Sequence, residues 1–527
     1  MKKIFCAAFL LASFSSVAQD STLIRLRIHA MTLRGVHFNN FNLFTFGGQK
    51  NNLQLGLYNA ITLDKTVLTG LYHQRPEQLS FQLPYNNSVL KLQFTKAHIL
   101  DNTKFIIADV AGEHEVPDYE KGVFYHGIIE GINENSFATL AVFSNSIKIF
   151  ISYRGKNIQA GSIDDKQLES SDYGVFGELP GNNDAMPVMC GTAAPADAAR
   201  VSVSQQYTLS PASINTYSGR VIRAFFDCSY DFYLHYSSST AQCYNRISAM
   251  FNQAALCYAN ETINTSIAEI RVWTVTDPYT HNTRDNGLAT FKDYVRDNYT
   301  GDLAMLCDWQ PTNNSGLADG IAVLCQAWSN VTNGPYIYND MNYNNYFINF
   351  PVAADAPDVY LMIHEMGHVL GSAHTQWCGW PGGAIDNCFT TEGGCPGGPT
   401  PVRGTLMSYC CLSSIIGIDF NYGFGPLPGN AIRTHINSVA CLTNISTVCD
   451  SSLYLQGNIS NTDYTVFEAH NSIIAQTNLS ASANVIFDAG KIIDLKPPFL
   501  APAGSKFRAL NEGCGGIYRQ SFIPKKL

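Results

Sequence analysis

The sequence is poor in charge, in basic runs and in long apolar stretches, and each shortage excludes a class of protein. Charged residues make up 14% of the chain, the formal net charge is -9 and no basic run occurs, so nucleic acid is not an expected partner. Beyond the first residues, no apolar stretch reaches the ~20 residues that a membrane-spanning helix needs. No transmembrane anchor is therefore expected. Residues 19–185 hold no cysteine, so a disulfide framework is excluded from that region.

The first residues have the pattern of a secretory signal peptide. Lys2 and Lys3 form a positive start, residues 4–14 form a short apolar run, and small residues end at Ala18. The alternative is an N-terminal membrane anchor, which needs a longer apolar run. The sequence therefore predicts cleavage near Ala18 and a secreted, extracellular protein.

Cysteines are concentrated in the second part of the chain. There are 15 in all, and Cys6 leaves with the predicted signal peptide. In an exported protein this density indicates disulfide bonds, although the pairing cannot be read from spacing. The cysteines from Cys378 to Cys441 lack a paired C-x₂-C pattern. They therefore predict disulfides that hold loops in place, in preference to a second metal site.

Length and local patterning indicate several domains. A chain of 527 residues with 46% hydrophobic residues is too long for one core. Alternating apolar residues predict strands before residue 185, strands and helices alternate after residue 221, and alternation returns near the end. The predicted parts are a signal peptide, a β-rich N-terminal domain ending in a linker, an α/β domain and a small all-β C-terminal module, at residues 1–18, 19–200, 201–447 and 448–527.

One motif carries the chemistry. His364 and His368 are four residues apart, so a helix places both imidazoles on one face, where they can share one Zn²⁺. Glu365 lies beside the first ligand and can act as the general base toward an attacking water. Gly371 can adopt the positive φ that ends the helix, and the turn lets His374 supply a third nitrogen. Chance would produce these five residues in about one of several thousand chains.

A second segment, Gly404–Tyr409, strengthens this interpretation. Together with the histidine motif it resembles the metzincin metallopeptidases, in which a methionine turn packs beneath the zinc, and Met407 matches that methionine. Taken alone, Met407 would more often be a core side chain. The resemblance implies a catalytic domain with a mixed twisted sheet and an active-site helix. It also implies one catalytic Zn²⁺ and hydrolysis of peptide bonds in proteins.

Within the metzincins the sequence is most similar to the reprolysin/adamalysin family. Pro187–Gly191 resembles that family's cysteine switch, which implies that Cys190 binds the zinc in a latent form; the alternative is a structural cysteine. Gly320, Ile321 and Ala322 begin a segment that resembles the family's substrate-binding edge strand; the alternative is a plain core strand. Residues 19–185 resemble the family's prodomain, so removing residues up to about Arg200 is expected to activate the enzyme.

Tyr409 is similar to a tyrosine of the astacin and serralysin branches. That resemblance implies a fifth zinc ligand or a group that stabilises the oxyanion, whereas a packed aromatic with a satisfied hydroxyl is the alternative.

Two rival functions remain open for the chain as a whole. One is a zinc-binding adhesin that keeps the metzincin fold without cleaving. The other is a surface-binding protein whose C-terminal module is the functional part. Glu365 argues against the first, because a structural zinc site has no need of a base. A calcium site has no support in the sequence. The sequence does not give the substrate preference or the oligomeric state.

Overall fold

The computed structural model describes residues 23–177, 189–193, 221–442 and 452–510, with short gaps inside these ranges. The predicted signal peptide, Pro187, Val188 and Arg200 lie outside the described residues. Within the described part of the chain, no helix is both long and apolar enough to cross a membrane.

The first part of the chain forms a ten-stranded sheet in the order β1-β4-β5-β8-β9-β10-β11-β12-β3-β2. Neighbours pair antiparallel except β1 and β4, and helices α1 (Leu23–Leu33) and α2 (Lys65–Gln74) accompany the sheet. The alternating residues 91–94 and 147–151 lie in β5 and β10, in agreement with the strands predicted before residue 185. The ten strands are β1 (Asn39–Asn40), β2 (Phe44–Asn52), β3 (Gly56–Leu63), β4 (Gln78–Tyr85), β5 (Ser88–Ala97), β8 (Val123–Ile129), β9 (Ser136–Val142), β10 (Ile147–Tyr153), β11 (Lys156–Ser162) and β12 (Asp172–Phe176).

The second sheet has eight strands in the order β13-β17-β18-β16-β14-β15-β6-β7. Its central strands run parallel, and β13 pairs in parallel with β17, while β17 pairs antiparallel with β18 and β7 pairs antiparallel with β6. The mixed sheet agrees with the predicted α/β class. Both ends of the sheet come from residues before 191, which the sequence did not predict. The eight strands are β6 (Lys104–Asp109), β7 (Gly112–Glu115), β13 (Met189–Cys190), β14 (Val221–Cys228), β15 (Asn264–Trp273), β16 (Leu303–Asp308), β17 (Ser315–Ala318) and β18 (Tyr336–Asp340).

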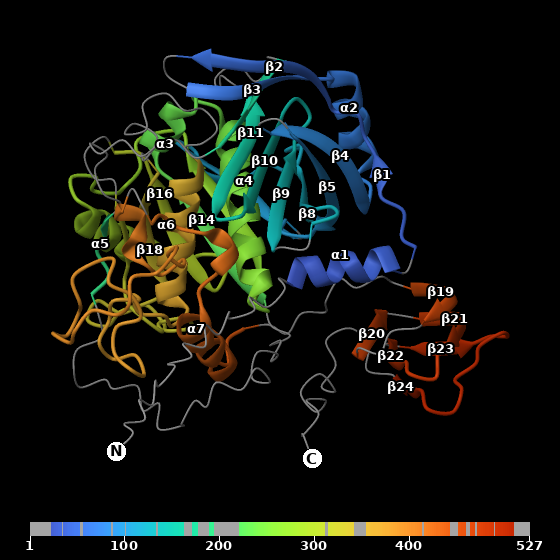
Figure 1. Ribbon diagram of the computed structural model, residues 1–527. Coiled ribbons are helices and arrows are strands. Elements are labelled where there is room, and N and C mark those ends of the chain that lie inside the picture. The colour runs from blue at the N-terminus through green and yellow to red at the C-terminus, as the bar shows by residue number, and fades with distance from the viewer. Residues whose placement is uncertain are drawn as a thin grey trace, which may run out of the picture.

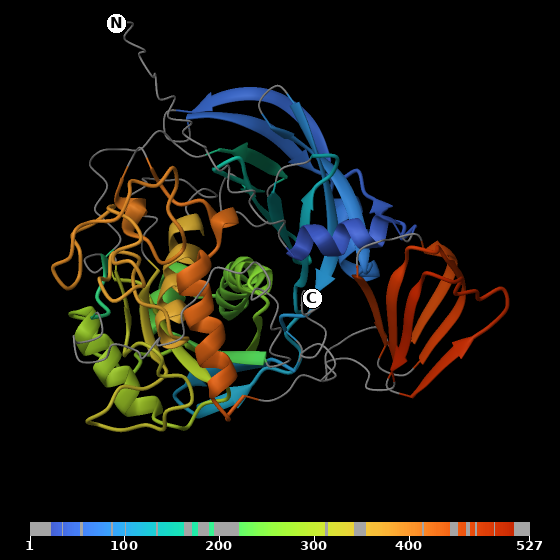
Figure 2. The same cartoon turned by 60° about the horizontal axis from the view of Figure 1, so that its bottom comes forward.

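Helices cover both faces of the eight-stranded sheet. Successive residues of β14 point to opposite faces, so Phe226 packs in the cluster around α4 and α6, while Phe225 packs in the cluster around α5. Figure 2 shows α4 close to end-on, enclosed between the two large sheets. The helices of this part are α3 (Tyr230–His235), α4 (Thr240–Asn260), α5 (Arg284–Val295), α6 (Asp355–Val369) and α7 (Pro426–Ser438), with single turns η3 (Tyr409–Leu412) and η4 (Phe420–Tyr422).

Helix α4 is the central helix of the molecule (Figure 1). The hydroxyl of Ser239 accepts a hydrogen bond from the backbone N–H of Gln242 and caps its first turn. The apolar face predicted from residues 241–258 is buried, but so are most of the other side chains between Cys243 and Tyr258. A helix that is buried on all sides needs packing partners on all sides, and the ten-stranded sheet supplies one of them.

The last part of the chain contains two three-stranded parallel sheets, β19-β21-β23 and β20-β22-β24. In the first sheet Ser452 pairs with Ser472, and Ser472 pairs with Ile492, so the structure repeats every 20 residues. This 20-residue spacing is not apparent in the sequence, because the coil repeats its backbone path while its residues differ. The strands are β19 (Ser452–Ile459), β20 (Tyr464–Ala469), β21 (Ser472–Leu479), β22 (Asn484–Ala489), β23 (Ile492–Leu495) and β24 (Lys506–Leu510).

Candidate active site

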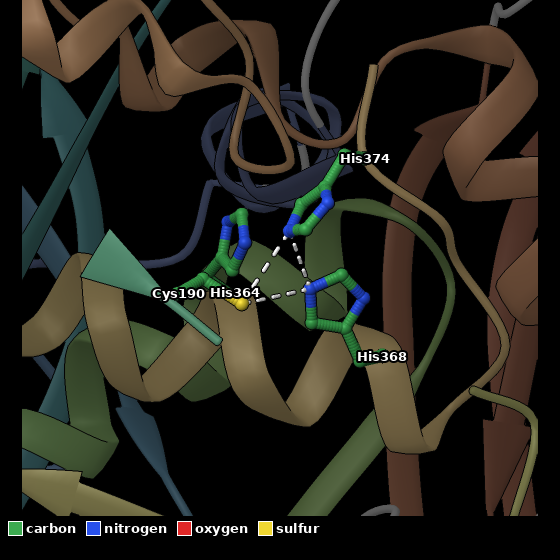
Figure 3. A group of neighbouring side chains, drawn as sticks. All are labelled: Cys190, His364, His368 and His374. Atoms are coloured by element: carbon green, nitrogen blue, oxygen red, sulfur yellow. Dashed lines mark hydrogen bonds between the residues drawn. The ribbon is translucent and has the colours of Figure 1, made fainter. Parts of the chain in front are cut away.

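Helix α6 and the turn that follows it place the three predicted histidines together. His364 and His368 lie one turn apart on α6, and the chain reverses at Gly371, whose φ of 117° is open to glycine but strained for other residues. His374 returns over the helix, and all three rings face Cys190 of β13 (Figure 3). The site therefore joins one helix, one turn and one short strand.

An oxygen atom lies within hydrogen-bonding distance of Nδ1, the outer nitrogen, of each imidazole. These oxygens are acceptors, so each Nδ1 carries the proton and each Nε2 keeps a free lone pair. The three contacts are His364 Nδ1 to the Leu406 carbonyl oxygen at 2.9 Å, His368 Nδ1 to the Ser372 carbonyl oxygen at 2.7 Å, and His374 Nδ1 to Glu392 Oε1 at 2.7 Å.

The Nε2 atoms, which are the inner nitrogens of the three imidazoles, form a site that fits a cation. His368 Nε2 lies 3.0 Å from His374 Nε2, and two lone pairs at that distance cannot hydrogen-bond to each other. His364 Nε2 is buried without a partner among the described residues. Burial and the neighbouring His374 lower the pKa of His364 to about 3, so its ring is in the neutral form that binds metals. Zn²⁺ accepts imidazole nitrogens and a thiolate in tetrahedral geometry, so the donor set fits zinc.

Cys190 completes this donor set. Its Sγ lies 3.4 Å from both His368 Nε2 and His374 Nε2, and the four donor atoms all lie within 4.8 Å of one another. Burial and the Glu365 carboxyl raise the pKa of the Cys190 thiol, whereas a cation among the imidazoles would favour the thiolate. Cys190 therefore occupies the position that a water or substrate would need.

The chain around Cys190 lies along the cleft as a strand. β13 pairs in parallel with β17, and the backbone N–H of Gly191 donates to the carbonyl oxygen of Gly316 at 2.9 Å. The hydroxyl of Tyr409 donates to the Cys190 carbonyl oxygen at 2.9 Å. Tyr409 thus lies in the site, with its ring centroid 4.7 Å from that of His374.

Glu365 is fully buried beside the histidines. Its Oε2 accepts hydrogen bonds from the Thr192 hydroxyl and from the backbone N–H of Ala318, both at 3.0 Å. Burial raises the pKa of Glu365 to about 7. A carboxyl group with a pKa near neutrality can both accept and return a proton, which is the requirement for a general base.

Met407 packs against Gly367 of α6. Its side chain is fully buried, and a Cβ atom on Gly367 would lie only 2.6 Å from its Sδ. The carbonyl oxygen of Met407 accepts from the backbone N–H of Thr375 at 3.1 Å, next to His374. The turn therefore supports two of the three histidines from below.

One predicted element is wrong. The strand that pairs with β13 at Cys190 is β17, Ser315–Ala318, whereas Gly320, Ile321 and Ala322 lie outside any strand, in the bend that follows it. Ala322 has a φ of 58°, and its backbone N–H donates to the carbonyl oxygen of His368 at 3.0 Å. The apolar run at 321–324 suggested a strand, but those residues cover the end of α6 instead.

Two residues of the site were missed by the sequence analysis. Thr192 binds Glu365, and Glu392 binds His374 from a loop 18 residues further along the chain. That loop is closed by the disulfide Cys378–Cys395, so the cysteine spacing was the only available signal. The disulfides Cys325–Cys441 and Cys388–Cys410 also form, which agrees with the prediction of loop-holding disulfides.

Replacing Glu392 with alanine is expected to weaken zinc binding by about 10–100-fold, because His374 loses the carboxylate that fixes its ring and tautomer. Competition with a chromophoric chelator measures this affinity without reference to activity. The exposed Asp285→Ala variant is the matched control. An unchanged zinc affinity in Glu392→Ala would show that the carboxylate does not orient His374.

A second group of candidate ligands, Asp231, His281 and Asp308, does not fit a metal. His281 Nδ1 lies 2.7 Å from Asp308 Oδ2, and His281 Nε2 lies 2.8 Å from Asp277 Oδ1. With carboxylates on both nitrogens the ring carries two protons and has no lone pair to offer. The hydrogen bonds and charges of the two aspartates raise the pKa of His281 to about 10 despite burial.

The contacts of His281 with Asp277 and Asp308 predict a stability that depends on pH. The folded-state pKa of His281 is about 10, above its ordinary value of 6.5, so its contribution is fully present below pH 6.5 and is lost as pH rises through 10. At pH 6 the free energy of unfolding of the His281→Gln variant is expected to be lower than that of the parent protein by a few kcal/mol. The difference should shrink near pH 10. Thermal unfolding of both proteins across this range measures it, and a constant difference would contradict the charged state.

Comparisons with known proteins agree with this geometry over the central part of the chain. A reprolysin-type sequence model described as metallo-peptidase family M12 matches residues 218–415, a range that includes the three histidines, Glu365 and Met407. A search of curated proteins found no match.

Two of the solved structures with detectable similarity differ widely in description. Metalloproteinase-II from Bacteroides fragilis is 12% identical over 57% of this chain and 82% of its own, with a TM-score of 0.33. A chaperone–substrate complex is 12% identical over 56% of this chain and 46% of its own, with a TM-score of 0.22. Scores this low support no argument about function, so the family match carries the assignment. The match supports a metzincin-like metallopeptidase domain of family M12 at residues 218–415.

Proposed function

We propose that the protein is a secreted zinc-dependent endopeptidase, synthesised in a latent form that Cys190 inhibits. One observation carries the proposal. Three imidazoles have their outer nitrogens bound, their inner nitrogens converge, and the Cys190 sulfur lies 3.4 Å from two of those nitrogens. Three histidines with one exchangeable ligand are the arrangement of a catalytic zinc site.

His364, His368 and His374 would hold the zinc. When bound, zinc polarises the scissile carbonyl group and makes the attacking water more acidic. Glu365 takes the proton from that water and passes it to the leaving amine. Its pKa of about 7 suits both transfers, and the N–H of Ala318 holds its carboxylate in place.

The substrate would lie along β17. In the latent chain, residues 189–191 already pair with this edge, so an extended peptide can form main-chain hydrogen bonds there once they leave. The binding edge is therefore Ser315–Ala318 and not the segment beginning at Gly320. Tyr409, freed from the Cys190 carbonyl, could donate its hydroxyl to the oxyanion.

Latency involves more than the sulfur. Thr192 donates its hydroxyl to Glu365, so the same short segment blocks the zinc and the base together. Three disulfides fit an oxidising, extracellular location, and the predicted signal peptide supplies the route of export.

Metal removal tests the proposal. The chain in which Cys190 is replaced by alanine is expected to bind one zinc ion and to hydrolyse casein. A chelator is expected to abolish hydrolysis, and added zinc to restore it. A protein that carries no stoichiometric zinc, or that keeps its activity after chelation, would refute a zinc peptidase, whereas bound zinc without hydrolysis would favour the adhesin alternative.

A further inference from the structure

The segment before the linker is attached to the metallopeptidase domain in two places of very different strength. We call residues 23–176 the N-terminal segment. Residues 189–192 contact the cleft, as described above. The much larger contact lies at β15, which is distant from β17 in the strand order of the eight-stranded sheet, and on the face of that sheet that α4 and α6 cover.

The first part of this larger contact is a shared sheet. Strand β6 does not join the ten-stranded sheet of the N-terminal segment. It pairs in parallel with β15, from Lys104 against Glu269 to Ala108 against Trp273. The hairpin partner β7 then forms the outer edge. Without the N-terminal segment, β15 would present an unpaired edge with an apolar face, which is an aggregation hazard.

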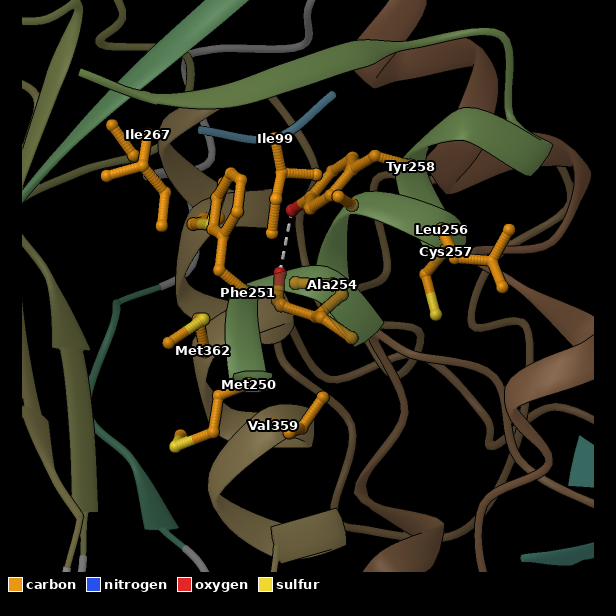
Figure 4. Close-up of a cluster of buried hydrophobic side chains, with 14 of the residues drawn as sticks. Ile99, Met250, Phe251, Ala254, Leu256, Cys257, Tyr258, Ile267, Val359 and Met362 are labelled. Atoms are coloured by element: carbon orange, nitrogen blue, oxygen red, sulfur yellow. Dashed lines mark hydrogen bonds between the residues drawn. The ribbon is translucent and has the colours of Figure 1, made fainter. Parts of the chain in front are cut away.

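The second part is a shared hydrophobic core. Apolar side chains of the N-terminal segment belong to the same cluster as α4 and α6. Figure 4 shows Ile99 between Ile267 of β15 and Tyr258 of α4. Phe105 is 2% exposed, and its ring lies 5.0 Å from that of Tyr244 on α4. Removing such apolar side chains from water is the main favourable contribution to association, so several together hold the segment firmly.

The third part is a set of hydrogen bonds that would be lost if the N-terminal segment separated from the metallopeptidase domain. Buried polar groups cost free energy when they lose their partners. The contacts are Thr103 Oγ1 to the Ile267 carbonyl oxygen at 2.6 Å, Tyr244 hydroxyl to the Ile106 carbonyl oxygen at 2.9 Å, Asn252 Nδ2 to the Leu140 carbonyl oxygen at 3.2 Å, and Arg271 Nη1 to Glu113 Oε1 at 2.6 Å.

The contact beside the histidines is small by comparison. Among the described residues it consists of the two-residue strand β13, the hydrogen bonds of Gly191 and Thr192, the hydrogen bond from Tyr409 to the Cys190 carbonyl oxygen, and the Cys190 sulfur. Once the chain is cut in the linker, these few residues can leave the cleft at low cost. The shared sheet and the shared core do not depend on the linker.

We propose that the N-terminal segment is a permanent part of the mature enzyme. Cleavage frees only the residues around Cys190, and residues 23–176 remain bound as a second chain that completes the sheet and the core. This differs from the expectation that removing everything up to Arg200 activates the enzyme. The account of activation rests on the proposed function, whereas the retention of the segment does not.

The test uses the full chain with a recognition sequence for a site-specific protease placed at Arg200. After cleavage, size-exclusion chromatography and native mass spectrometry determine whether the two pieces stay together. We expect one particle with the mass of the uncut chain, which separates only in denaturant. Separate pieces, or precipitation of either piece when the uncut chain is soluble, would overturn the proposal.

Three variants make the test specific. Cys190→Ala removes the sulfur–zinc link, so retention in this variant shows that the sheet and the core hold the segment. Separation in this variant alone would show that Cys190 was the tether and would overturn the proposal. Phe105→Asp places a charge in the shared core and is expected to release the segment after cleavage. Val110→Asp, at the 93% exposed turn between β6 and β7, should leave it bound.

Binding and hydrolysis are read separately. The cut Cys190→Ala protein is expected to hydrolyse casein while both pieces remain in one particle. One particle without hydrolysis or zinc would refute the proposed function and leave retention intact. Hydrolysis by a free C-terminal piece would refute retention and leave the proposed function intact.

Discussion

The Glu365→Gln variant is expected to lose peptide hydrolysis by about 10²–10⁴-fold while it keeps its zinc. Glutamine has nearly the same shape and can still accept from Ala318 N–H, but it cannot take a proton from water. The loss should therefore appear in kcat, with little change in zinc affinity. Hydrolysis of casein and of a fluorogenic peptide by the cut Cys190→Ala protein measures the effect.

A matched variant separates this effect from a general loss of charge. Glu130→Gln makes the same substitution at an exposed residue and should retain full activity. Equal activity in Glu365→Gln and its parent, with zinc bound in both, would mean that Glu365 is not the base. In that case the fold would serve binding in place of cleavage.

The Cys190→Ala variant is expected to gain activity in the uncut chain. Loss of the sulfur opens one position at the zinc, and each tenfold gain corresponds to about 1.4 kcal/mol of lost inhibition. The gain should be partial, because Thr192 still binds Glu365 and residues 189–191 still pair with β17. The double variant Cys190→Ala/Thr192→Ala should be more active than either single variant.

A second buried cysteine provides the control for this prediction. Cys257 is free and fully buried, and it does not belong to the cluster of candidate ligands. Cys257→Ala should leave the uncut chain latent. If Cys190→Ala binds zinc and remains as inactive as the parent, the cysteine switch is wrong and the N-terminal segment inhibits by another contact.

The residues that lie close together in the sequence were placed well by sequence reasoning. The spacing of His364, Glu365 and His368 on a helix, and the reversal at Gly371 that brings back His374, follow from local backbone geometry. The structure brings Cys190, Met407 and Tyr409 to the same site, and their roles stay predictions. The cysteine cluster correctly indicated disulfides around long loops.

The errors arose where the outcome depended on distant contacts. An apolar run such as 321–324 fits a strand or a covering turn equally well, and only its contact with α6 decided between them. Glu392 reaches His374 through a loop closed by Cys378–Cys395, a pairing that spacing could not give. Strands β6 and β7 lie in the eight-stranded sheet, although the strands before and after them along the chain lie in the ten-stranded sheet. The alternation of apolar residues could not predict this, since the pattern of β6 predicts a strand in either sheet.

The sequence by itself determined the helix that carries His364 and His368, the position of Glu365 beside His364 and the reversal at Gly371 that returns His374. These depend on helical period and on the chemistry of a few side chains. Tertiary structure decided which strand forms the cleft edge, which carboxylate supports His374 and how firmly the N-terminal segment is held. Those outcomes depend on contacts between residues that are separated along the chain, from 18 positions for Glu392 with His374 to more than 100 for Phe105 with Tyr244. Local pattern does not encode such pairings, because many partners would satisfy the same strand or apolar face.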